Sequence, residues 1–178
     1  MPTFKQQYRA IKHRIIATHN PLQGVISFFG SNNITTIRKY APALCKEKFF
    51  TDAIAGTFFP STLPRLGHCG NMPFFHELDR ALLWYILALK LGSKQINEFL
   101  VLRANFDHAF LFGEYDTCLT LLDECHEHFG WSVWEIKNRI AVLSEREGID
   151  AQKQYTRTVL AEMQSGSILY YLVNSFSK

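Results

Sequence analysis

Four glycines in the C-terminal half of the chain divide it into segments of nearly constant length. Gly113 and Gly148 are 35 residues apart, and Gly130 and Gly166 are 36 residues apart. Each interval has room for two helices of about 16 residues joined by a short link. Spacing of this kind predicts a helix-turn-helix repeat, in which each helix pair packs on the next pair.

The residues between these glycines have helical periodicity. The segment after Gly113 places a series of side chains three or four positions apart on one helix face: Tyr115, Cys118, Leu122, Cys125 and Phe129. We expect Cys125 to be a small buried residue of this face. Ser132 and Glu135 stand at the N-cap and N3 positions of the next helix and predict a capping box, and Trp131 and Ile136 predict a hydrophobic staple.

The stretch LFGEYDTCLTLLDECHEHFG resembles a known repeat family. Leu111, Gly113 and Tyr115 stand roughly where tetratricopeptide (TPR) repeats place a leucine, a glycine and a tyrosine, and Leu119 stands near the small residue of that pattern. Residues 96–166 therefore resemble TPR-like α-hairpin repeats. The resemblance implies a stack of antiparallel helix pairs with a concave face for a partner.

The N-terminal residues 1–50 predict two or three basic helices. Phe4, Tyr8, Ile11 and Ile15 recur at helical spacing. Thr3 and Gln6 predict a capping box at the start of this helix, and the pair Asn20-Pro21 predicts its end. Asn33 can cap a second basic helix, over 34–50, with Pro42 as a kink or break.

The middle of the chain divides a basic segment from a repeat-like segment. Residues 51–73 contain three prolines and three glycines and predict an irregular linker or loop, or short helical turns between two helical halves. We expect a buried central helix to start near residue 74 and stop at Gly92, with Ser93 capping the next helix. The sequence thus predicts a single all-α domain, 1–178, in which N-terminal basic helices precede stacked antiparallel α-hairpins at 74–178.

Charge is distributed unevenly along the chain. Residues 1–50 hold eight Lys or Arg and one Glu, for a net charge of +7, whereas the rest hold eleven basic and fifteen acidic residues, for −4. Six of the basic residues are candidates for binding a partner or nucleic acid: Lys5, Arg9, Lys12, Arg14, Arg38 and Lys39. The alternatives are a solvated face, a docking surface for an acidic protein, a membrane surface, or pairing with the acidic part of the chain.

One segment, GHCGNMPFFHELDR at 67–80, contains chemically reactive side chains. Cys69, with His68 and His76, could serve a thiol-dependent reaction or bind a metal. In the alternative interpretation this stretch is a loop that enters a helix, with Asn71 as the cap and Pro73 in the first turn. The sequence contains no G-x-S-x-G and no glycine-rich phosphate-binding motif. We therefore expect no cofactor and no resident metal.

These patterns favour a protein-protein interaction or scaffolding module over an enzyme. We expect a cytoplasmic, bacterial protein with a protein partner, and we keep self-association open. One setting is the N-terminal part of a larger assembly, such as a toxin-neutralising or defence component. The alternatives are nucleic-acid binding through residues 1–50 and a Cys/His-dependent enzyme or metal-binding protein. No signal peptide or transmembrane segment is predicted, because the longest uncharged apolar run has nine residues, at 81–89.

Overall fold

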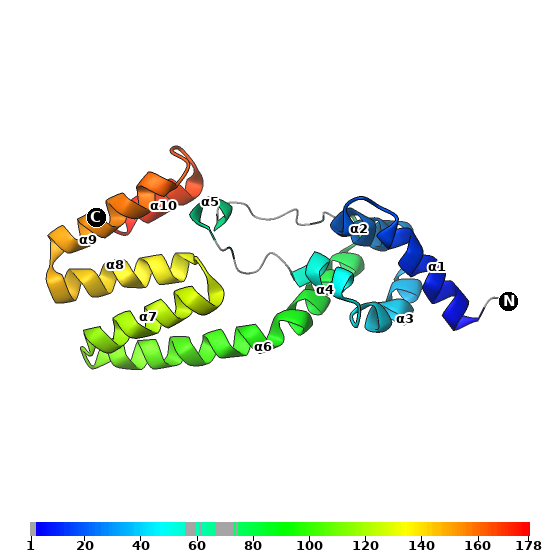
Figure 1. The fold of residues 1–178 in the computed structure, drawn as a ribbon, viewed down its shortest axis with the longest axis horizontal. Helices are drawn as coiled ribbons and strands as arrows, with labels where there is room; N and C mark the ends of the chain where they lie inside the picture. Colours follow the sequence, from blue (N-terminus) through cyan, green and yellow to red (C-terminus); the bar gives the residue numbers. More distant parts are fainter. Residues whose placement is uncertain (1–2, 56–59, 61, 67–72, 74) are drawn as a thin grey trace. The chain divides into compact units, whose positions relative to one another are not determined.

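The computed structural model describes residues 3–55, 60, 62–66, 73 and 75–178. Within these residues the chain is all-α, with ten helices and no strand, which confirms the predicted fold class (Figure 1). The contacts divide it into an N-terminal unit, 1–58 with 71–94, and a C-terminal unit, 59–70 with 95–178. Each unit is described by itself below, and the single domain expected over 1–178 stays a prediction.

The N-terminal unit consists of four short helices and the first part of a long one. They are α1 (Phe4–Ile16), α2 (Pro21–Ser31), α3 (Ile34–Leu44), α4 (Lys48–Ala55) and α6 (Leu78–Leu111) up to residue 94. The predicted capping box at α1 is present, because the Thr3 hydroxyl accepts from the Gln6 backbone and the Gln6 side chain accepts from the Thr3 backbone. The Asn33 side chain caps α3, as predicted, by accepting from the Thr36 N–H at 2.8 Å.

Two predicted boundaries in this unit are wrong. α1 ends at Ile16, before Asn20, and Asn20 instead caps α2 by accepting from the Leu22 N–H at 3.0 Å. A proline at the first position of a helix needs no N–H partner, so Asn20-Pro21 starts a helix here. The expected helix over 34–50 is divided into α3 and α4, but α3 continues through Pro42 to Leu44.

Aromatic side chains form much of the core of the N-terminal unit. Phe28, Phe29 and Phe50 are completely or almost completely buried. The Phe29 ring meets the Trp84 ring edge-to-face, with 5.1 Å between their centroids, and this contact joins α2 to α6. Such aromatic pairs add about 0.5–1.5 kcal/mol to the free energy of burial. One continuous cluster of buried residues therefore holds this unit together.

The C-terminal unit is a series of packed helices. It consists of α5 (Leu63–Leu66), the remainder of α6, α7 (Tyr115–Phe129), α8 (Val133–Glu147), α9 (Ile149–Glu162) and α10 (Ile168–Ser175). In Figure 1, α7, α8 and α9 follow one another as antiparallel neighbours, and α8 packs against both α7 and α9. These packed helix pairs are compatible with a helical repeat.

The glycines that predicted the repeat lie at the links between these helices. Gly113, Gly130, Gly148 and Gly166 have φ angles of +71°, +70°, +91° and +82°. Positive φ is accessible to glycine at little cost and ends a helix sharply. The glycine spacing therefore predicted the ends of α6, α7 and α8 to within two residues, whereas α9 ends at Glu162, four residues before Gly166.

Gly92 behaves differently, and the prediction that it stops a helix is wrong. α6 runs through it without interruption for 34 residues, and the Ser93 hydroxyl donates to the Lys90 carbonyl instead of capping a new helix. A single internal glycine costs about 1 kcal/mol, which the helix-forming residues on either side offset. α6 also starts later than expected, at Leu78, so Pro73 lies before its first turn.

The expectation that the first part of α6 is a buried helix is wrong for one of its faces. Trp84, Leu87 and Ala88 are buried in the N-terminal unit. The opposite face of the same helix carries five apolar side chains that are 43–72 % exposed: Leu78, Leu82, Tyr85, Ile86 and Leu89.

Candidate functional site

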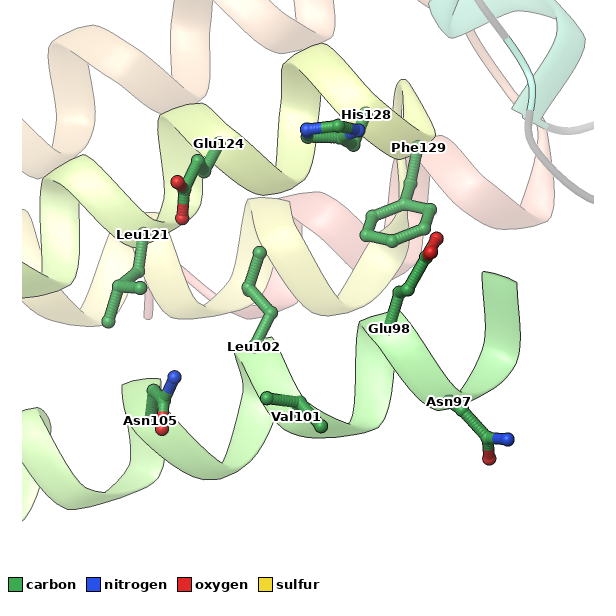
Figure 2. A pocket seen from close by; sticks show the side chains of 9 residues that line it. All are labelled: Asn97, Glu98, Val101, Leu102, Asn105, Leu121, Glu124, His128 and Phe129. Atoms are coloured by element: carbon green, nitrogen blue, oxygen red, sulfur yellow. The ribbon is translucent and has the colours of Figure 1, made fainter. Parts of the chain in front are cut away.

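A groove of about 490 Å³ lies between α6 and α7 in the C-terminal unit, and we call it the α6–α7 groove. α6 contributes Asn97, Glu98, Val101, Leu102 and Asn105, and α7 contributes Leu121, Glu124, His128 and Phe129. Figure 2 shows Leu121 and Phe129 projecting from α7 toward α6, and Glu98 and Leu102 projecting from α6 toward α7.

The α6–α7 groove combines an apolar floor with an acidic rim. Leu102 and Phe129 are buried at its base, while Val101 is 63 % exposed in its wall. Glu98 and Glu124 are exposed, one on each helix. An exposed aliphatic side chain between two carboxylates suits an apolar group that carries positive charge.

A second concave site, which we call the α7–α9 pocket, has a volume of about 520 Å³. Its apolar and aromatic wall consists of Leu119, Trp131, Leu143 and Tyr155, and its polar wall consists of Asp123, His126, Glu127, Glu135 and Arg139. The His126 ring meets the Trp131 ring edge-on, with 4.5 Å between their centroids. Charged and aromatic groups thus converge on one site between three helices.

An ion-pair network links the helices around this pocket. Arg139 of α8 donates from Nε to Glu135 Oε1 at 2.7 Å and forms an ion pair from Nη2 to Asp123 Oδ1 of α7 at 2.8 Å. The Arg139 guanidinium also lies 6.0 Å from the centre of the Tyr155 ring, on α9. The Glu135 side chain is only 1 % exposed, so this network contains a carboxylate that is almost fully removed from water.

Two buried oxygens of the pocket residues lack hydrogen-bond partners among the described residues. They are Glu135 Oε2 and the Tyr155 hydroxyl. Burial raises the pKa of Glu135 against the opposing effect of Arg139, and burial with the nearby Glu135 charge raises the pKa of Tyr155 far above its usual range. Unpartnered buried polar groups of this kind are often found at functional sites.

Glu135 is a residue whose role the sequence did not predict. Only half of the predicted capping box is present: the Ser132 hydroxyl accepts from the Glu135 N–H at 3.0 Å, but the Glu135 side chain does not accept from the Ser132 N–H. The Glu135 carboxylate, however, is buried and bonds Arg139, because a nearby guanidinium stabilises it where water cannot. The i,i+4 spacing of Glu135 and Arg139 was the one available signal.

The basic candidates of residues 1–50 lie on α1 and α3 of the N-terminal unit. Lys12 forms an ion pair with Glu47 at 2.8 Å, and Glu47 also accepts from the Tyr8 hydroxyl at 2.7 Å. Burial and this carboxylate raise the pKa of Tyr8 to about 12. The other five candidates are exposed: Lys5, Arg9, Arg14, Arg38 and Lys39.

Lys39 connects the two basic helices through aromatic rings. Its ammonium group lies 5.9 Å from the centre of the Phe4 ring and 5.2 Å from that of Tyr40, and these two rings stack with 5.0 Å between their centroids. The Phe4 side chain is 47 % exposed. The start of α1 and the middle of α3 therefore present cations beside an exposed ring.

His68 and Cys69, two of the three catalytic or metal-binding candidates, lie outside the described residues, and His76 is exposed. Burial raises the pKa of Cys45, Cys118 and Cys125, the last to about 11, which opposes thiolate formation. Cys118 and Cys125 are fully buried, which confirms the prediction made for Cys125. In the part of the chain that the structure describes, no cluster of three or more His, Cys, Asp or Glu residues could hold a metal ion.

The chain matches no family model, and comparisons with curated proteins and with solved structures also find no match. Among the described helices, none is long and apolar enough to cross a lipid bilayer.

Proposed function

We propose that the protein is a TPR-like interaction and scaffolding module that binds a partner protein in the α6–α7 groove. The observation that carries this proposal is the groove itself, with an exposed aliphatic wall at Val101 and the carboxylates of Glu98 and Glu124 at its rim. Grooves between helices commonly bind an amphipathic helix through its apolar face. Because the rim of the groove is acidic, we propose that it binds a helical segment of another protein that carries Lys or Arg beside its apolar stripe.

A synthetic amphipathic helix of leucine and lysine tests this proposal, with a leucine and glutamate peptide as its charge-reversed partner. We expect fluorescence anisotropy to show binding of the lysine peptide and far weaker binding of the glutamate peptide. Val101→Asp places a charge in the groove wall and should weaken binding at least about tenfold, since an apolar contact is lost and a carboxylate is desolvated.

Leu111→Asp is the matched control. Leu111 lies on the same helix, is 83 % exposed, and does not line the groove. It adds the same charge, so the net charge of the protein is equal in the two variants and only the position of the new carboxylate differs. Equal affinity of both variants for the peptide would contradict the proposed groove.

Nucleic-acid binding through the N-terminal unit is the second candidate function, and the cluster of Phe4, Lys39 and Tyr40 favours it. Exposed aromatic rings beside cations bind single-stranded nucleic acid by stacking and by phosphate contacts. We expect a fluorescent single-stranded oligonucleotide to bind at low salt and to dissociate steeply as salt rises. Phe4→Ala should weaken binding without changing the salt dependence, whereas Arg9→Gln should reduce that dependence. Binding that is absent at low salt, or insensitive to salt, excludes this candidate.

A further inference from the structure

The α7–α9 pocket has an excess of negative charge. Asp123, Glu127 and Glu135 line it, against the single guanidinium of Arg139. That guanidinium is already shared between Asp123 at 2.8 Å and Glu135 at 2.7 Å. A ligand entering the pocket therefore meets a lining whose uncompensated charge is negative, and this favours a cation.

Glu135 provides an independent indication of a ligand. Its side chain is 1 % exposed, and its Oε2 has no hydrogen-bond partner within the described part of the chain. A buried carboxylate oxygen without a donor is costly, and an N–H group of a ligand would supply that donor. An acidic surface cluster would lack this feature, because water would satisfy each oxygen.

The rest of the wall suits an aliphatic stem that ends in a cation. Leu119 and Leu143 provide apolar contacts, and the rings of Trp131 and Tyr155 border the same space. An ammonium or guanidinium group over an aromatic face is attracted by the electrons of the ring. A space of about 520 Å³ accommodates a group of this size.

We propose that the α7–α9 pocket binds an ammonium or guanidinium group on an aliphatic stem, with Glu135 and Glu127 as its anionic contacts and Trp131 as its aromatic wall. The source of the cation is either a free alkylamine or a Lys or Arg side chain of a peptide. The pocket shares no lining residue with the α6–α7 groove, so this site does not depend on the proposed partner groove.

Nuclear magnetic resonance of the whole chain can test the proposal with two probes. The probes are n-butylammonium chloride and a capped peptide with one lysine between glycines. The observed signal is the indole N–H of Trp131, which Trp131→Phe identifies. The indoles of Trp84 and Trp134 serve as internal references, because neither lines the pocket. We expect a saturable shift at Trp131 alone.

Two uncharged controls separate charge recognition from apolar binding. They are n-butanol and the same peptide with norleucine in place of lysine. A response to n-butylammonium alone assigns the site to a free amine, and a response to the lysine peptide alone assigns it to a side chain. A response to both probes supports the shared chemistry. Equal shifts from the uncharged controls, or none from either cation, would overturn the proposal.

Glu135→Gln should weaken binding of the responding probe at least about tenfold, because it removes the buried charge while keeping the size of the side chain. Glu127→Gln changes an exposed residue of the same pocket and should weaken binding about two- to fivefold. The matched control is Glu162→Gln, which changes an exposed carboxylate of α9 that lines neither the pocket nor the groove and should leave the affinity unchanged. If Glu135→Gln does not fold, Glu127→Gln serves as the test. Wild-type affinity of Glu127→Gln for the probe would then contradict cation binding in the α7–α9 pocket.

Discussion

The two units of the chain stabilise their helices in different ways. The N-terminal unit has one continuous core cluster in which the aromatic rings of Phe28, Phe29, Phe50 and Trp84 take part. The C-terminal unit has three smaller clusters, and an ion-pair network of α7 and α8 lies beside them. In the N-terminal unit the corresponding ion pair, Lys12 with Glu47, is partly exposed to water.

This difference bears on which unit holds concave sites that combine apolar and charged side chains. The N-terminal core is mainly aromatic and aliphatic, and the hydroxyl groups of Tyr8 and Tyr40 at its edge donate to Glu47 and Gln7 of the same unit. Helices that pack as a series leave space between successive pairs, and charged side chains such as Glu135 and Arg139 can occupy it. Both proposed sites, the α6–α7 groove and the α7–α9 pocket, lie in the C-terminal unit, whereas the exposed basic cluster lies in the N-terminal unit.

The largest expected effect comes from Phe29→Ala, which removes a fully buried ring in contact with Trp84. We expect a loss of about 3–5 kcal/mol in the free energy of unfolding of the N-terminal unit. Hydrogen exchange should show lost protection in α1 to α3 and retained protection in α7 to α9. Ile140→Ala, in the C-terminal core, should give the reverse pattern. If either variant lowers protection equally in all helices, the units unfold together, as one domain over 1–178 requires.

A smaller effect, of opposite sign in the two units, is expected from two glycine substitutions. Gly148 has a φ of 91° and a ψ of 178°, a conformation open essentially only to glycine, so Gly148→Ala should destabilise by about 1–3 kcal/mol. Gly30→Ala in α2 meets no atom within 4 Å and should stabilise by about 0.4–1 kcal/mol. Urea denaturation measures both, and a shared sign would show that backbone conformation is not the cause.

The smallest effect concerns pH, and its direction should differ between the units. The hydrogen bond from Lys12 lowers the pKa of Glu47 in the folded state. The stability that the Glu47 carboxylate contributes is therefore present above its pKa in the unfolded chain and is lost as pH falls through its pKa in the folded chain. Burial raises the pKa of Glu135 in the folded state. The stability that Glu135 contributes is therefore present below its pKa in the unfolded chain and is lost as pH rises through its pKa in the folded chain. Urea denaturation at several pH values measures how the free energy of unfolding depends on pH. The part of this dependence due to Glu47 should vanish in Glu47→Gln, and the part due to Glu135 should vanish in Glu135→Gln. An unaltered pH dependence of the free energy of unfolding in either variant would contradict the corresponding pKa shift.

The sequence predicted features that depend on a few neighbouring residues. The Thr3 capping box, the Asn33 cap and the four glycine links are of this kind, because each is set within one turn of the backbone. Gly92 shows the limit of such reasoning. Its neighbours in sequence suit a helix on both sides, so the glycine alone could not decide whether the helix stops.

Features that depend on distant residues could not be predicted. The position of the Glu135 carboxylate depends on Arg139, whose other partner is Asp123 on a different helix. Lys12 was predicted as a candidate for binding a partner or nucleic acid, yet it forms an ion pair with Glu47, 35 positions away. Each of these contacts requires knowledge of which helix faces are adjacent, and periodicity alone does not provide that.

The glycine links have a consequence for how a chain of this kind can change in length. Gly113 and Gly148 both follow a helix and both have positive φ, and the residues between them form α7 and α8. A tandem duplication of 114–148 would therefore place a positive-φ glycine directly before each copy. Such a duplication would lengthen the chain by one helix pair.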